Sequence, residues 1–162
     1  MAECKWCGGK GFFVRIDSNS LCKKCENHAP LRIIPSAKQV KHFIDAADVV
    51  KTTTSKITNY DTAIYYAGLI LPYEKKGIPT CNPPPSDIIK QCNAFKDEVI
   101  VEEMQQICTK ALDRVSSAKS PKGVDAACNA GLKKIRDVSS RLFDQSLGIK
   151  YIKKIEVVQR NP

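Results

Sequence analysis

Apolar residues recur every three or four positions through most of the chain beyond residue 35, which is the spacing of one face of an α-helix. Two stretches interrupt this pattern: a proline triplet at Pro83-Pro84-Pro85, and the sequence Lys119-Ser120-Pro121. The pattern therefore predicts about four helices, which run from Ser36 to about Ile57, from Tyr60 to about Lys76, from Ser86 to about Ser117 and from Val124 to about Leu142.

Short polar residues at the edges of these stretches predict where the helices begin. Ser36 and Ser86 are expected to be the N-caps of the first and third helices, and Asn59 or Asp61 that of the second. Gly148 is the expected C-cap of the fourth helix, because glycine readily adopts the left-handed conformation that ends helices.

A faint internal repeat suggests how the helices pair. Ala67-Gly68-Leu69 resembles Ala130-Gly131-Leu132, and each copy follows a helix and a corner rich in Ser, Thr and Lys. We therefore expect a mostly α body of two helical hairpins, with Gly68 and Gly131 where helices cross closely. Coincidence between two short amphipathic stretches is the alternative.

The final segment, residues 146–162, fits two structures. Leu147, Ile149 and Tyr151 alternate as in a strand, whereas Leu147, Tyr151 and Ile155 share a helical face. We expect a basic tail that is either a strand or a short helix, and that either docks on the core or binds a partner.

The first 34 residues depart from the helical pattern and carry two Cys-x-x-Cys pairs separated by 14 residues. Each pair can place two sulfurs about 2.3 Å from one metal ion. Glycines follow the first pair, and a strand is expected at Phe12, Phe13, Val14 and Ile16, before the turn residues Asp17-Ser18-Asn19-Ser20. The spacing predicts one structural Zn²⁺ bound by Cys4, Cys7, Cys22 and Cys25. His28 is either an alternative ligand or a solvent-facing turn residue.

This arrangement of two cysteine pairs around a hairpin resembles the zinc-ribbon superfamily, over about Met1 to Ile34 only. The resemblance implies metal binding and says little about function, because such ribbons serve in transcription, translation, nucleic-acid enzymes and protein adaptors. We expect a small N-terminal β zinc ribbon at residues 1–34, a helical domain at residues 35–145 and the tail at 146–162.

The charge balance favours an anionic partner. The chain has 26 Lys and Arg against 17 Asp and Glu, a formal net charge of +9. Four thiolates around one dication would lower it by about two. An excess of this size favours nucleic acid or an acidic protein surface, although the charge is spread along the chain.

Basic and aromatic residues of the ribbon could contact single-stranded nucleic acid by charge and stacking. Trp6 has an alternative role, which is to cover the metal site or to pack the ribbon onto the helices. The candidate contact residues for nucleic acid or another partner are Lys5, Trp6, Lys10, Arg15, Lys23, Lys24, Lys133, Lys134 and Arg136.

Motifs for catalysis are not found. The sequence contains no phosphate-binding loop, dinucleotide fingerprint, nucleophile elbow or His-Glu-x-x-His helix. The four other cysteines match no metal spacing and are expected to be mostly buried, with Cys81 the one to test for reactivity. We infer no catalytic residue and no small-molecule substrate.

The sequence therefore predicts a non-enzymatic zinc-containing binding protein that associates with nucleic acid. The alternative is a protein–protein interaction adaptor or inhibitor that docks through its helical body. We expect no membrane span, because a span needs about 20 apolar residues, and a reducing, cytoplasmic location.

Overall fold

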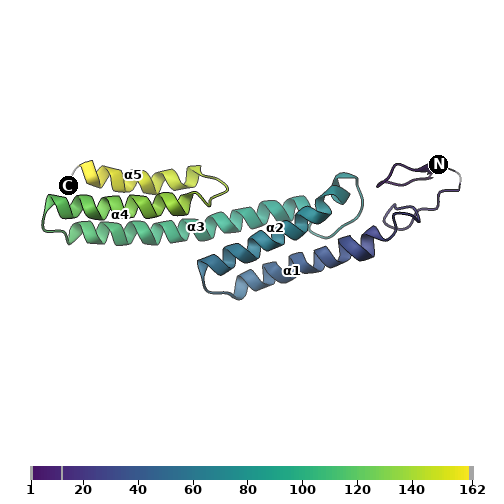
Figure 1. The fold of residues 1–162 in the computed structure, drawn as a ribbon, viewed down its shortest axis with the longest axis horizontal. Helices are drawn as coiled ribbons and strands as arrows, with labels where there is room; N and C mark the ends of the chain where they lie inside the picture. Colours follow the sequence, from purple (N-terminus) through teal and green to yellow (C-terminus); the bar gives the residue numbers. More distant parts are fainter. Residues whose placement is uncertain (1, 12, 161–162) are drawn as a thin grey trace. The chain divides into compact units, whose positions relative to one another are not determined.

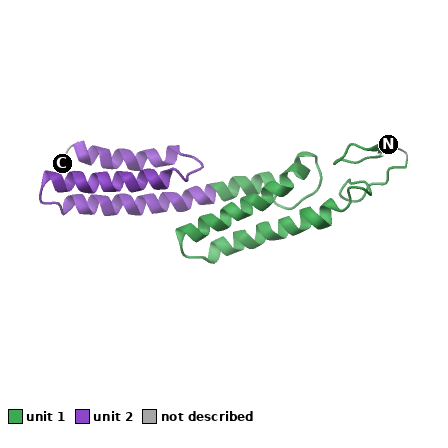
Figure 2. Cartoon of the chain, viewed as in Figure 1, with its two compact units in different colours: residues 1–93 green, residues 94–162 purple. Residues whose placement is uncertain are grey.

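The computed structural model describes residues 2–11 and 13–160. Phe12, which the sequence predicts in a strand, lies outside the described residues. Helices make up most of the chain, and a small two-stranded sheet lies at its amino-terminal end (Figure 1). The chain divides into two compact units, residues 1–93 and residues 94–162 (Figure 2).

The small sheet joins β1 (Ala2–Glu3) to β2 (Lys10–Gly11), which pair antiparallel with Ala2 opposite Gly11. A single bridge pairs Ile16 with Cys22 farther along. The continuous strand predicted through Phe13 and Val14 is wrong. The amide of Val14 donates to the Gly11 carbonyl at 3.3 Å, and this bond folds the segment into a turn.

A short π-helix, η1 (Ala29–Ile33), runs directly into α1 (Ile34–Val49). The predicted N-cap at Ser36 is wrong, because Ser36 is buried inside the helix. Pro35 occupies the first turn of α1, and the Ile34 amide just before it donates to the Ala29 carbonyl of η1, so the two helical segments are continuous.

Helix α2 (Thr53–Lys75) begins earlier than Tyr60, the predicted start. The Thr52 hydroxyl caps it by accepting a hydrogen bond from the Ser55 amide at 3.2 Å, so the predicted caps Asn59 and Asp61 lie within the helix. Helices α1 and α2 pack side by side (Figure 1). Their shared core contains Val40, Ala47, Tyr60, Ala63 and Ala67 together with Ile88 and Cys92 from the next helix.

Helix α3 (Pro85–Ser116) begins in the first unit and continues into the second. The second unit also contains α4 (Pro121–Ser139) and α5 (Ser146–Arg160). Ser120 caps α4 by accepting from the Gly123 amide at 3.2 Å. The described residues thus form five α-helices, one more than the four predicted.

The extra helix is α5, which settles the strand-or-helix alternative for the tail in favour of a helix. The predicted C-cap Gly148 is wrong, because Gly148 is buried within α5. A Cβ there would lie 2.9 Å from the Ser139 Cβ, so the close approach of α4 accounts for the glycine.

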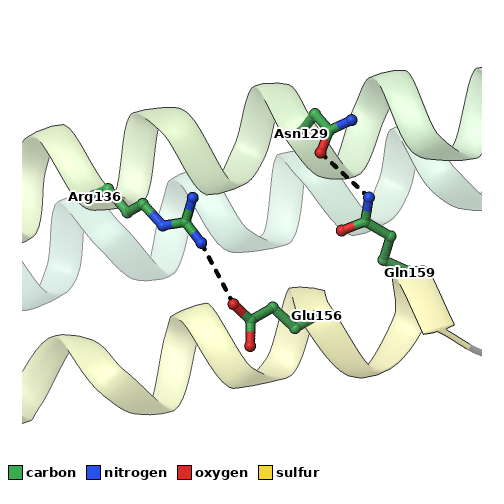
Figure 3. A network of polar contacts seen from close by, with 4 residues as sticks. All are labelled: Asn129, Arg136, Glu156 and Gln159. Atoms are coloured by element: carbon green, nitrogen blue, oxygen red, sulfur yellow. Dashed lines mark hydrogen bonds and ion pairs between the residues drawn. The ribbon is translucent and has the colours of Figure 1, made fainter.

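Polar contacts join α5 to α4 within the second unit. The Arg136 guanidinium of α4 lies 3.4 Å from the Glu156 carboxylate of α5, and the Gln159 amide donates to the Asn129 side-chain oxygen at 3.2 Å (Figure 3). At the α4–α5 corner, the buried Asp97 carboxylate accepts hydrogen bonds from two backbone amides, those of Phe143 and Asp144. Within the described residues, no helix is long and apolar enough to cross a membrane.

Candidate metal centre

The first cysteine pair lies in a tight turn after β1. The Cys4 amide donates to the Gly9 carbonyl at 3.0 Å, and the Gly8 amide donates to the Cys4 carbonyl at 2.8 Å. Gly8 has a φ of +71°, a left-handed conformation that favours glycine. This turn brings Cys4 and Cys7 to the same side of the chain.

The second pair follows a turn that Asp17 organises. Its carboxylate accepts hydrogen bonds from the amides of Asn19 and Leu21, at 2.9 and 2.8 Å. The Cys25 amide then donates to the Cys22 carbonyl at 2.7 Å. The polar cluster that predicted a turn therefore also positions Cys22 for the metal site.

The two turns bring the four thiol sulfurs of Cys4, Cys7, Cys22 and Cys25 within 4.8 Å of one another. The sulfurs of Cys7 and Cys22 are 3.9 Å apart. Four sulfurs on a tetrahedral metal with bonds of about 2.3 Å would be about 3.8 Å apart. The sulfur set therefore fits a four-coordinate metal ion.

The four thiols differ in their exposure. Cys4 and Cys25 are buried, at 0% and 7% exposed, whereas Cys22 is half-buried and Cys7 is exposed. The centre thus has one face within the protein and one face toward solvent.

The electrostatics around the sulfurs favour negative charge at Cys4. Burial alone would raise the pKa of Cys4, but hydrogen bonds from the backbone amides of Cys7, Cys22 and Trp6 outweigh it and lower this pKa to about 6. Burial raises the pKa of Cys25 to about 12, and its sulfur neighbours add to the effect. Because the four sulfurs are so close together, all four thiols can be ionised at the same time only if a cation lies among them.

An aromatic cluster packs this centre against the C-terminal end of α2. The Trp6 ring stacks on the Tyr73 ring with centroids 4.4 Å apart and planes 19° apart. His28 packs 4.8 Å from Trp6, and a 2.7 Å hydrogen bond joins its Nδ1 to the Tyr73 hydroxyl. Trp6 therefore packs the first cysteine turn onto α2, and the half-buried His28 belongs to this aromatic cluster and not to the group of four sulfurs.

Two lysines, one in the first cysteine turn and one at the end of α2, join these two elements. Lys5 of the turn donates to the Gly77 carbonyl at 2.7 Å. Lys76 donates to the Trp6 carbonyl, and its ammonium lies 4.4 Å from the centroid of the Trp6 ring. Both ammonium groups are therefore held where the first cysteine turn meets the end of α2.

The remaining candidate contact residues fall into two groups. Arg15, Lys23 and Lys24 are exposed in the first unit, while Lys10 pairs with Glu3 at 3.1 Å. Lys133 and Lys134 are exposed on α4 in the second unit, where Arg136 is paired with Glu156. The candidates therefore belong to different units.

Sequence reasoning missed Tyr73 and Lys76, which complete the surroundings of the metal centre. Gly77, with a φ of +66°, signals the end of α2, but no local pattern indicates that this end meets the cysteine turns. The remaining cysteines agree with expectation, since Cys92, Cys108 and Cys128 are buried. Burial also raises the pKa of Cys81, which is half-buried.

Comparison with known proteins gives no relative: no protein-family model matches the chain, and no match is found among curated proteins or solved structures.

Proposed function

We propose that this chain is a non-enzymatic zinc protein whose amino-terminal zinc ribbon associates with nucleic acid. The convergence of four thiols within 4.8 Å carries the proposal. Soft thiolate ligands in tetrahedral geometry select zinc or iron among common metals, and paired Cys-x-x-Cys turns around a hairpin favour zinc.

The role of the zinc is structural. Four thiolates fill the coordination shell, so no position is left for a substrate or an activated water. Two ligands, Cys4 and Cys25, belong to a core cluster with Leu21, Ile70 and Tyr73. Zinc binding therefore contributes folding free energy to the cysteine turns and to their packing on α2. Thiolate ligands also require reduced cysteines, which supports a cytoplasmic location.

Unpaired positive charge supports nucleic acid as the partner. Arg15, Lys23, Lys24 and Arg32 are exposed, and no carboxylate among the described residues forms an ion pair with them. Such cations can displace the counterions of a phosphate backbone, which is the main source of sequence-independent affinity.

Fluorescence anisotropy with labelled single- and double-stranded oligonucleotides, from about 50 to about 200 mM salt, tests this proposal. Binding should weaken steeply as salt rises. An absence of binding at the lowest salt, or tight binding that salt does not weaken, would overturn it.

A protein partner is the second candidate, favoured by apolar side chains that the helices leave exposed. Val49 of α1 is 77% exposed, and Tyr65 and Leu69 lie one turn apart on the exposed side of α2. An adaptor would bury such residues against its partner. A stoichiometric protein recovered by pull-down after nuclease treatment would support this role, and recovery that nuclease abolishes would exclude it.

A further inference from the structure

A small hollow of about 130 Å³ lies next to the second cysteine pair. Its lining consists of Lys24, Asn27, His28, Leu31 and Arg32. Four of these side chains can donate hydrogen bonds through N–H groups, and no carboxylate is among the described residues that line it. This chemistry favours an anion.

Both cations of the hollow are available to an external ligand. Lys24 and Arg32 are exposed, and neither forms an ion pair with a carboxylate in the described part of the chain. Lys10, by contrast, is bound to Glu3 at 3.1 Å. An arginine guanidinium, which can donate two parallel hydrogen bonds, beside a lysine ammonium is a common combination for binding phosphate oxygens.

One wall of the hollow is held in place by the metal centre and the core. The His28 amide donates to the Cys25 carbonyl at 3.0 Å, and its ring is fixed by the Tyr73 hydroxyl. Leu31 forms another part of the lining and is 73% exposed. The hollow therefore combines a fixed polar wall with an apolar surface that a bound chain could cover.

The size of the hollow limits its occupant. Sites for whole small molecules measure about 300–1,000 Å³, so a hollow of about 130 Å³ admits a single group and not an entire nucleotide. We propose that it seats one backbone phosphate of a bound nucleic acid strand, with Lys24 and Arg32 contacting the phosphate oxygens. This inference rests on the proposed function and specifies where the strand is positioned.

The negative charge of a zinc tetrathiolate opposes an anion at this place. Lys5 and Lys76 reduce that opposition, because their ammonium groups are fixed at the first cysteine turn by the carbonyls of Gly77 and Trp6. A phosphate contact of this kind fixes the register of the strand but does not read its sequence.

The test compares a double variant, Lys24→Gln with Arg32→Gln, with the control Lys38→Gln, which removes one exposed charge of α1 outside the hollow. Zinc content and far-UV circular dichroism should be the same in all proteins, because these side chains are exposed. Anisotropy with a single-stranded oligonucleotide is measured across the salt series.

The double variant should bind at least about tenfold more weakly and lose about 0.7 from the slope of log affinity against log salt, since the hollow holds one phosphate and each single-strand phosphate contact contributes about 0.7. Lys38→Gln should change the slope by less than half as much. If the wild type binds and the double variant loses no more slope per charge than Lys38→Gln, the hollow is not the phosphate seat, although the proposed function stands. If the wild type binds no oligonucleotide, both proposals fail.

A titration with inorganic phosphate separates the two sources of the phosphate group. Nuclear magnetic resonance of the Arg32 side-chain N–H follows occupancy directly. Shifts caused by inorganic phosphate in a protein that binds no oligonucleotide would assign the hollow to free phosphate and overturn its assignment to nucleic acid.

Discussion

Replacing glycine with alanine is expected to have opposite effects on stability at Gly131 of α4 and at Gly68 of α2. A Cβ added at Gly131 of α4 would lie 2.6 Å from the Ala111 Cβ of α3 and 3.1 Å from the Ile155 Cδ1 of α5. A Cβ added at Gly68 of α2 would meet nothing within 4 Å among the atoms of the described chain. Gly131→Ala therefore forces helices apart, whereas Gly68→Ala fills open space.

The magnitudes follow from two effects. Replacing glycine with alanine inside a helix stabilises it by about 1 kcal/mol. At Gly131, a carbon–carbon distance of 2.6 Å is about 1 Å shorter than normal contact. The Ala111 Cβ cannot rotate away, so the backbone has to move, and overpacking of this kind costs about 2–3 kcal/mol. We expect Gly131→Ala to destabilise its unit by about 1–2 kcal/mol and Gly68→Ala to stabilise its own by about 1 kcal/mol.

Urea unfolding followed by far-UV circular dichroism measures the free energies of unfolding, and amide hydrogen exchange assigns each change to its unit. Slower exchange in α2 is expected for Gly68→Ala, and faster exchange in α3 and α4 for Gly131→Ala. A Gly131→Ala variant at least as stable as the wild type would refute the packing of α4 against α3.

Three further predictions concern the core and the metal centre. Asp97→Asn should lower the free energy of unfolding by about 1–3 kcal/mol, because the Phe143 and Asp144 amides bond different carboxylate oxygens and asparagine replaces one of these oxygens with an NH2 group that cannot accept; urea unfolding checks this value. Tyr73→Ala should cost about 3–5 kcal/mol, whereas Tyr73→Phe, which keeps the ring under Trp6 and loses only the bond to His28, should cost about 1 kcal/mol. The emission of Trp6, the single tryptophan, follows both unfolding transitions. Zinc should be retained at neutral pH and released as the pH falls, because protons compete with the metal for the thiolates; a colorimetric chelator measures the release, and retention that does not depend on pH would argue against thiolate ligands.

The cysteine site could be predicted from sequence because its signal is local. Two residues between the members of each pair, with glycines after Cys7 and a polar turn before Cys22, fix the geometry within each turn. The helices are equally local, since their apolar spacing shows directly in the chain. The ends of the helices depend less on local sequence. The predicted cap at Ser36 is wrong because η1 leads into α1 without a break.

Long-range packing was not predictable from these patterns. Residues 6 and 73 are far apart in the chain, and no periodicity indicates that the Trp6 ring stacks on Tyr73. The two matching glycines also show that local sequence does not determine packing, because similar sequences give a tight helix contact at Gly131 and open space at Gly68. The expected equivalence of these positions is wrong for their packing.

Native mass spectrometry of the purified, tag-free protein tests the central claim most directly. Prepared under reducing conditions with zinc available, each chain should carry one zinc ion, and a variant with Cys4→Ser and Cys25→Ser should carry none. A wild-type chain without metal, or a double variant that still holds one zinc, would contradict the four-thiolate centre.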